Sequence, residues 1–349
     1  MHRTSPGIAA LAIAAALAGC GGGSGGGGPR TVPIVLAPHT VLAIPTDVDV
    51  DGSPDIADPH VLKIGAVWYL YATQTKRNLE AWTSVDLATW EREGAVWEPT
   101  PGTWNEAGQA WAPHVEATEA GYYLYYVKDQ KLGVAWSPSP LGPFEEIQDQ
   151  PLVGGGHGGV GNGVEEWPAP LDFLNFDEHA IDAFVLKASD GSLTLYFVPS
   201  TPFGEIWAIP MIDYATLADV EPTVVLSPDL ASWEGVVVEA PWVIEHEGRF
   251  HLLYSGNIAF APEYAIGVAV GPTPLGPFER RADNPFLATD ASAAFWGPGH
   301  LSIAPGPAGG RLMFYHTKVG PDFRADRRIR YAPVSFDAQG SLRLDVPAP

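Results

Sequence analysis

The chain has 349 residues, 46% of them hydrophobic, and contains 39 glycines, 34 prolines and 12 tryptophans. A chain of this length can bury a substantial core, and so many glycines and prolines are typical of short strands joined by tight turns. The formal net charge of −22 argues against nucleic acid or an anionic membrane surface as a partner, and it suits a neutral substrate better than an anionic one.

The first 20 residues are interpreted as a targeting segment. A basic start at His2 and Arg3 precedes an apolar run, Ile8 to Leu17, that is too short to span a bilayer. The run leads into Ala18-Gly19-Cys20, a pattern that resembles the bacterial lipoprotein signal, in which the cysteine is diacylated and becomes the new N-terminus. Cys20 is the only cysteine, so no disulfide can form within a monomer. The alternative is an ordinary secretory signal with an incidental cysteine.

This resemblance implies a protein of the bacterial cell envelope that faces the periplasm or the exterior. Its only contact with the membrane would be the lipid anchor at Cys20. Residues 21–32 are expected to form a flexible, glycine-rich tether. Residues 33–349 are expected to form the folded domain, whose first repeat extends to Pro99.

Five repeats follow one another along this domain. Each has a short strand, a glycine turn and an apolar second strand, as in residues 57–71, and a third strand further on. The opening positions recur every 55 to 69 residues, as from 58 to 113 and from 113 to 182. They are Asp58, Pro113, Asp182, Glu239 and His300. Repeats of this length, built from strands alone, predict an all-β, five-bladed β-propeller. A large β-sandwich with hairpins at similar spacing is the competing interpretation.

Two further stretches bear on this organisation. The segment Pro138–Glu145 is almost repeated by Pro272–Glu279, which supports a duplicated blade. The glycine-rich stretch 154–163 is interpreted as a flexible insertion, because no Lys-Ser/Thr pair follows it as a phosphate-binding loop would require.

Three of the five opening positions are carboxylic acids: Asp58, Asp182 and Glu239. The innermost strand of each propeller blade lines the central channel, so these acids are expected in one shared, partly buried funnel. Crowded carboxyl groups cannot all ionise easily, and the resulting split of their pKa values can provide one acid and one base. The alternative is that each acid only bonds to backbone amides of a local turn.

Five short motifs surround the opening positions. In chain order they are Asp58-Pro59, Trp111-Ala112-Pro113, Ile181-Asp182, Glu239-Ala240-Pro241 and Gly297-Pro298-Gly299-His300. Their order and spacing resemble family 43 of the glycoside hydrolases over about residues 45–345. The resemblance implies a five-bladed propeller that hydrolyses arabinose- and xylose-containing plant polysaccharides with inversion at the anomeric carbon. Ala183 and Ala240 stand where the family usually has proline and glycine, which leaves the subfamily and the substrate open.

The resemblance also implies roles for the three acids. Asp58 is expected to be the general base that activates water. Glu239 is expected to be the general acid that protonates the leaving oxygen. Asp182 is expected to raise the pKa of that acid and to orient it.

Three further residues are expected to contact the substrate. Trp111 would stack on a sugar ring, and Arg327 roughly matches a sugar-binding arginine of the family. His300 matches a central-channel histidine that in some members contacts a calcium ion through water. No cofactor is required on this interpretation, and calcium at His300 is the one metal that it suggests.

We therefore expect a lipid-anchored, monomeric glycosidase that acts on neutral oligo- or polysaccharides. The first expectation is an α-L-arabinofuranosidase, with β-xylosidase and arabinanase activities as related alternatives. Two other classes stay open: a non-catalytic glycan-binding lipoprotein with the same propeller, and a scaffold propeller that binds proteins. The three acids argue against the binder, and a scaffold would carry its motifs on outer loops instead of at inner-strand starts.

Overall fold

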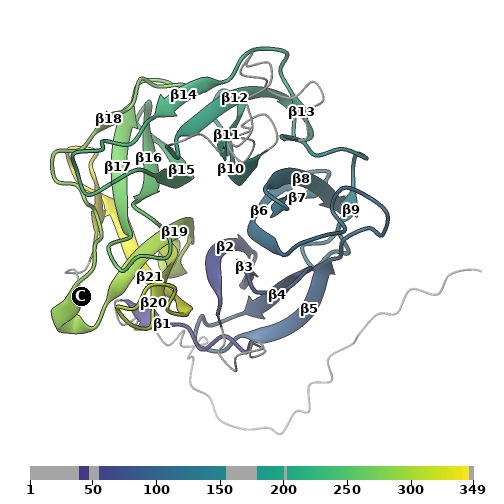
Figure 1. The fold of residues 1–349 in the computed structure, drawn as a ribbon, viewed down its shortest axis with the longest axis horizontal. Coiled ribbons are helices and arrows are strands. Elements are labelled where there is room, and N and C mark those ends of the chain that lie inside the picture. The colour runs from purple at the N-terminus through teal and green to yellow at the C-terminus, as the bar shows by residue number, and fades with distance from the viewer. Residues whose placement is uncertain (1–38, 47–54, 155–178, 200–202, 346–349) are drawn as a thin grey trace, which may run out of the picture. The chain divides into compact units, whose positions relative to one another are not determined.

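The computed structural model describes residues 39–46, 55–154, 179–199 and 203–345. Within these residues the chain forms five antiparallel sheets arranged as a ring, which confirms the all-β, five-bladed propeller and excludes the sandwich (Figure 1). Cys20, the tether 21–32 and most of the stretch 154–163 lie outside the described residues. No helix in the described part of the chain is long and apolar enough to cross a membrane.

Each blade is built from strands that follow one another in the sequence. The first blade holds β2 (Ala57–Ile64), β3 (Val67–Thr73), β4 (Leu79–Ser84) and β5 (Glu91–Trp97), and the second holds β6 (Ala110–Thr118), β7 (Gly121–Lys128), β8 (Lys131–Ser137) and β9 (Glu145–Glu146). The third holds β10 (Ala180–Lys187), β11 (Leu193–Pro199), β12 (Ile206–Asp213), β13 (Thr216–Leu217) and β14 (Thr223–Leu226). The fourth holds β15 (Val238–His246), β16 (Arg249–Gly256), β17 (Ala265–Gly271) and β18 (Glu279–Arg280). The fifth holds β19 (Trp296–Pro305), β20 (Arg311–Lys318), β21 (Arg327–Phe336) and β22 (Leu342–Leu344), together with β1 (Thr40–Val41).

The short strand β1 closes the ring. Thr40 pairs with Tyr331 and Val41 with Arg330, so the start of the described chain joins the last blade. The sequence interpretation had assigned this region to the first blade, and that assignment is wrong. A strand of two residues carries no alternation of apolar and polar side chains that could indicate its partner.

The hydrophobic core is divided among the five interfaces between neighbouring blades. One cluster joins the fifth and first blades through Phe314 and Leu70, and another joins the third and fourth through Tyr196 and Leu252. The remaining three clusters join the other neighbouring pairs in the same way. Because each sheet is covered on both faces, its central strands are apolar throughout and do not alternate, which explains the continuous apolar second strands of the sequence.

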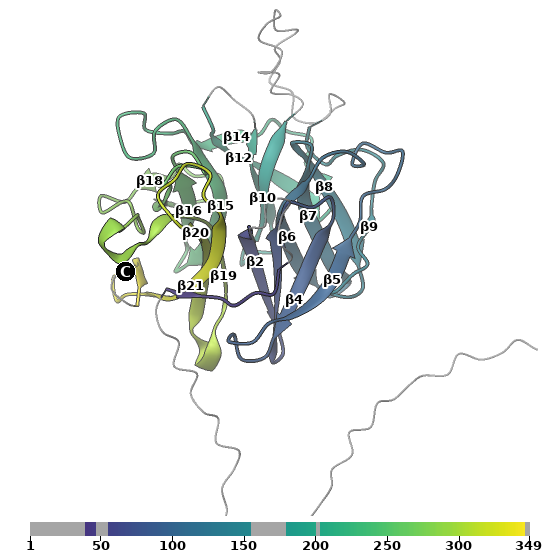
Figure 2. The same cartoon turned by 60° about the horizontal axis from the view of Figure 1, so that its bottom comes forward.

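The innermost strands β2, β6, β10, β15 and β19 surround the central axis (Figures 1 and 2). Near its start, each has a break in pairing register with its neighbour. In each break one non-glycine residue has positive φ: Asp58 (52°), Ala112 (43°), Asp182 (58°), Ala240 (53°) and His300 (44°). Such β-bulges bend a strand and redirect its side chains, and they are common next to active sites. The ring therefore carries the same backbone feature five times around its centre.

This feature corrects the register inferred from the sequence. Asp58, Asp182 and His300 are equivalent positions, as expected. Their equivalents in the second and fourth blades are Ala112 and Ala240, not Pro113 and Glu239. Glu239 therefore lies one residue before the bulge and leaves the strand in a different direction from the two aspartates. The sequence carries a signal for this register, since proline directly follows Asp58, Ala112 and Ala240.

Candidate active site

The bulges connect each blade to its neighbour. In three of them the backbone amide of the bulge residue donates to a side chain of the preceding blade, and in a fourth it lies against one. Ala112 N donates to Thr73 Oγ1 (2.7 Å) and His300 N donates to Ser255 Oγ (2.8 Å). Ala240 N donates to Asp182 Oδ2 (3.1 Å), and the Asp58 amide faces His316 Nδ1 at 3.3 Å. The inner ends of the blades, and with them the acids, are thus fixed relative to one another.

Asp58 is surrounded by nitrogen atoms of the fifth blade. Its Oδ1 lies 3.3 Å from His300 Nδ1, 3.2 Å from His316 Nδ1 and 3.7 Å from Arg327 Nη1. Burial alone would raise the pKa of Asp58, but the charges and hydrogen bonds of these neighbours outweigh it and hold the pKa well below its usual value. Burial lowers the pKa of both imidazoles, so at neutral pH Arg327 supplies the lasting positive charge. Asp58 is therefore held ionised.

Arg327 is itself fixed by a second carboxylate, Asp55. Its Nη2 lies 2.7 Å from Asp55 Oδ2 and its Nε 3.1 Å from Asp55 Oδ1, the two-bond geometry typical of strong arginine–carboxylate pairs. Burial opposes the charge of the guanidinium, but Asp58 and Asp55 together raise the pKa of Arg327. Asp55 thus orients the cation that faces Asp58.

Glu239 and Asp182 have different surroundings. Glu239 Oε1 accepts a 2.6 Å hydrogen bond from the hydroxyl of Tyr264, and the buried Asp182 carboxylate accepts from the amide of the residue after Glu239. Burial and the charge of Asp58 raise the pKa of Glu239 to about 7, although the Tyr264 hydrogen bond acts against them. Burial and the charges of Glu239 and Asp58 raise the pKa of Asp182 well above its usual value. At neutral pH the pair of carboxyl groups therefore keeps at least one proton.

The motif Gly297-Pro298-Gly299-His300 has a steric explanation. A Cβ atom on Gly299 would lie 1.9 Å from the ring of Tyr264, so only glycine allows that ring to pass. The Tyr264 ring also stacks on the ring of His316, with 5.8 Å between centroids and 9° between planes. Tyr264 thus packs beside His316, next to Asp58, while it bonds to Glu239. It connects the two halves of the site.

Side chains fill the channel beyond the bulges. The residues that lie two positions after the five bulge residues are His60, His114, Phe184, Trp242 and Ser302. The His60 and His114 rings are 4.6 Å apart, and the Phe184 and Trp242 rings 4.7 Å apart. Burial lowers the pKa of both histidines, that of His114 to about 3, so they are neutral. The acids therefore lie at one end of a closed channel.

Calcium does not fit this channel. A cavity of about 20 Å³ remains, and Asp182 and His300 are among its lining residues. That volume accommodates about one water molecule, whereas calcium takes six to eight oxygen ligands. Asp182 is the only carboxylate in the lining. In the part of the chain that the structure describes, no group of three or more His, Cys, Asp or Glu side chains is placed to hold a metal.

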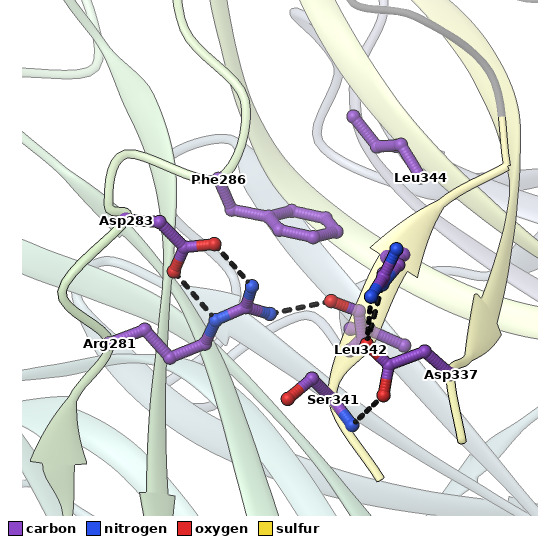
Figure 3. Close-up of a pocket in the computed structure, with 8 residues that line it drawn as sticks. Arg281, Asp283, Phe286, Asp337, Ser341, Leu342 and Leu344 are labelled. Carbon is purple, nitrogen blue, oxygen red and sulfur yellow. Dashed lines mark hydrogen bonds and ion pairs between the residues drawn. The ribbon is translucent and has the colours of Figure 1, made fainter. Parts of the chain in front are cut away.

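A larger cavity, of about 530 Å³, lies away from the acids, between the outer strands of the fourth and fifth blades (Figure 3). Arg281 in its wall bonds to both carboxylate oxygens of Asp283 (2.9 and 2.5 Å) and to the Leu342 carbonyl (2.5 Å). Arg343 is paired with Asp337 at 2.5 Å. The two arginines that line this cavity are thus paired with other groups of the protein. None of the bulge residues lines it.

The structure brings together Asp58, Asp182, Glu239, His300 and Arg327. Trp111 occupies in β6 the position that Glu239 occupies in β15, one residue before the bulge, and is partly exposed. Sequence reasoning missed the partners of these residues: Asp55, Ser255, Tyr264, His316 and Lys318. Lys318 is buried, which lowers its pKa to about 8, and it acts electrostatically on Glu239.

Two of the comparisons with known proteins name the same family. The family model "Glycosyl hydrolases family 43" matches residues 52–342. The chain is 23% identical over 299 residues to a β-D-galactofuranosidase of Aspergillus niger, covering 78% of this chain and 77% of that one. Among solved structures, a thermostable family-43 glycoside hydrolase is 30% identical with a TM-score of 0.72, covering 84% of this chain and 94% of that one. An endo-1,4-β-xylanase of Bacteroides thetaiotaomicron is 26% identical with a TM-score of 0.71, covering 84% and 95%.

Proposed function

The chain belongs to family 43 of the glycosyl hydrolases, and from that premise we propose that it is an inverting glycosidase that releases α-L-arabinofuranosyl units from plant-type oligo- or polysaccharides. Release of β-xylosyl units and cleavage of arabinan are the related alternatives. The substrate is a carbohydrate in each case.

One observation carries the proposal: the site holds carboxyl groups with opposite proton affinities. Arg327 and two imidazoles keep Asp58 ionised, whereas burial and mutual repulsion keep a proton on the pair Glu239 and Asp182. Glycoside hydrolysis by inversion needs such a pair, an ionised base for water and a protonated acid for the leaving oxygen.

In the proposed reaction Asp58 removes a proton from water as the water attacks the anomeric carbon. Glu239 gives its proton to the glycosidic oxygen as that bond breaks. The two residues come from the first and fourth blades, which are not neighbours in a ring of five, so they can act from opposite sides of the sugar. The new bond forms on the face opposite the broken one, which inverts the configuration.

The other residues support these two steps. The carboxylate of Asp182, bonded to the Ala240 amide, repels charge on Glu239 and so favours its protonated form. Tyr264 fixes the direction of the Glu239 carboxyl. We assign sugar contacts to Trp111, as a stacking surface, and to Arg327 and His300, whose nitrogens face the space in front of Asp58.

One relative supports a five-membered sugar ring. The Aspergillus niger relative is named as acting on β-D-galactofuranosides. An α-L-arabinofuranoside has the same ring configuration and differs only in a shorter substituent at C4. One pocket could therefore accept both sugars, and the length of that substituent would decide between them.

The test is hydrolysis of the nitrophenyl α-L-arabinofuranoside, β-D-galactofuranoside and β-D-xylopyranoside, with the Asp58→Ala variant purified in parallel as control. We expect turnover of the arabinofuranoside by the wild type alone. Proton NMR of the first product should show the inverted anomer. Binding of oligosaccharides without turnover of any glycoside would favour the non-catalytic binder instead.

We further propose that Cys20 carries a lipid anchor. The support is the apolar run before it and the glycine tether after it. Cys20→Ser should move the expressed protein from the membrane fraction to the soluble fraction. Wild-type protein that is soluble, with no lipid mass on its N-terminal peptide, would contradict the anchor.

A further inference from the structure

Four exposed apolar side chains lie on two neighbouring loops. One loop (257–264) follows β16 of the fourth blade, and the other (319–326) follows β20 of the fifth. The side chains are Ile258 (42% exposed), Phe260 (41%), Val319 (55%) and Phe323 (60%). Clustered exposed apolar groups, unlike scattered ones, mark surfaces that bind something.

The two phenylalanines form a fixed surface with Arg324. Their rings meet edge to face, with 6.1 Å between centroids. The Arg324 guanidinium lies 4.8 Å from the Phe260 ring centre and 5.9 Å from that of Phe323. The Arg324 amide donates to the Phe260 carbonyl (2.9 Å), which joins the two loops. A ligand would meet a surface that is already ordered, which reduces the entropic cost of binding.

This surface adjoins the Glu239 side of the site. Lys318, next to Val319, donates a hydrogen bond to the carbonyl of Ala259, next to Phe260. The same loop continues to Tyr264, whose hydroxyl bonds to Glu239. The Pro262 carbonyl between them accepts from the Gly297 amide (3.1 Å), so the loop is tied to the fifth blade as well. Phe260 therefore lies four residues along the loop from Tyr264, which contacts the proposed proton donor.

Resting on the proposed function, we infer that Phe260, Phe323 and Arg324 bind the part of the substrate that leaves with the proton from Glu239. A sugar chain has apolar ring faces that stack on aromatic rings, and hydroxyl groups that accept from a guanidinium. The general acid must contact the leaving oxygen, so a binding surface beside it meets the leaving chain. The preferred substrate class is accordingly an arabinofuranosyl unit attached to an oligo- or polysaccharide, in preference to a small arabinofuranoside.

The test compares two substrates whose leaving groups differ in length. One is α-L-arabinofuranosyl fluoride, whose leaving group is a single atom, and the other is an arabinofuranosyl-substituted xylo-oligosaccharide. In the variant Phe260→Ala/Phe323→Ala, the ratio of kcat/KM for the oligosaccharide to that for the fluoride should fall at least about tenfold, the effect of losing one well-packed aromatic contact. Ile212→Ala, at the far end of β12 and 69% exposed, is the control and should leave the ratio unchanged.

A second measurement separates this inference from the proposed function. Calorimetric binding of the same oligosaccharide to Glu239→Gln, with and without the phenylalanine substitutions, needs no turnover. Binding that weakens about tenfold supports the surface even if no glycoside is hydrolysed. A ratio and an affinity that change less than twofold overturn the inference. A change confined to the elution volume in size-exclusion chromatography also overturns it, because the surface then contacts a second copy of the chain.

Discussion

Asp58 and Glu239 are carboxyl groups on inner strands of the same ring, yet their surroundings favour opposite charge states. Asp58 faces two imidazoles and the Arg327 guanidinium. Glu239 faces a phenol and lies close to a second buried acid, Asp182. Part of the difference comes from position, because Asp58 is the bulge residue of its blade and Glu239 lies one residue before the bulge of the fourth. The rest comes from the residues that neighbouring blades present to each bulge, so the chemistry of the site depends on the blade interfaces.

Removing the base should have the largest effect. Asp58→Ala should lower kcat by roughly 10³- to 10⁴-fold on every substrate, because Asp58 is the ionised carboxylate at the inner-strand bulge, and Asp55, the other carboxylate beside Arg327, is bonded to that guanidinium through both oxygens. Initial rates on an aryl glycoside and on an oligosaccharide measure it. Asp190→Ala, on an exposed turn of the third blade, is the matched control and should retain activity. Near-wild-type rates for Asp58→Ala would show that another group activates the water.

Removing the acid should have an effect that depends on the leaving group. Glu239→Ala should be about 10³-fold slower on an oligosaccharide, whose leaving oxygen needs a proton. With a dinitrophenyl glycoside, whose leaving group needs none, the loss should be at least tenfold smaller. The slope of log kcat/KM against leaving-group pKa is the measurement. Equal losses on both substrates would remove Glu239 from the proton-donor role.

A smaller effect should follow from relieving the repulsion on the acid side. The charge of Glu239 raises the pKa of Asp182. Repulsion between two carboxylates is reciprocal, so the charge of an ionised Asp182 raises the pKa of Glu239 in turn. Asp182→Asn keeps an oxygen for the Ala240 amide but removes the charge. The pKa of Glu239 should then fall, and the basic limb of the kcat/KM profile should move to lower pH by about one unit. A basic limb that stays in place would mean that Asp182 only orients its neighbour.

Much of the fold could be predicted from the sequence. The second strands are long apolar runs, and the turn glycines at positions 65, 121, 191, 248 and 309 all have positive φ, as tight turns require. The two-residue outer strands β9 and β18 could not be predicted, because so few residues carry no period. Strand β1 was misassigned for the same reason.

The candidate site could be predicted as far as its acids, His300 and Arg327. The partners that were missed come from strand ends that are distant in sequence: His316 is 258 residues from Asp58. One signal was present, since the ends of the second strands carry Thr73, Ser255 and His316 in three blades. In the other two they carry Val127 and Val198, which cannot accept a hydrogen bond. The expectation that polar residues at these strand ends contact the bulge of the next blade would have identified His316.

The smallest effect should come from His316, and it tests the base side of the comparison. His316 is buried, and its hydrogen bond to Asp58 lowers the pKa of that carboxyl. His316→Phe keeps an aromatic ring against Tyr264 but removes the bond, so the pKa of Asp58 should rise. Asp58 must be ionised to act, and the acidic limb of the kcat/KM profile should therefore move to higher pH, with a loss of roughly tenfold or less at the optimum. His316→Asn, whose side-chain amide can donate from near the position of Nδ1, should restore the limb. A uniform loss of rate with an unmoved acidic limb would assign His316 a packing role alone, and would leave Arg327 as the group that keeps Asp58 charged.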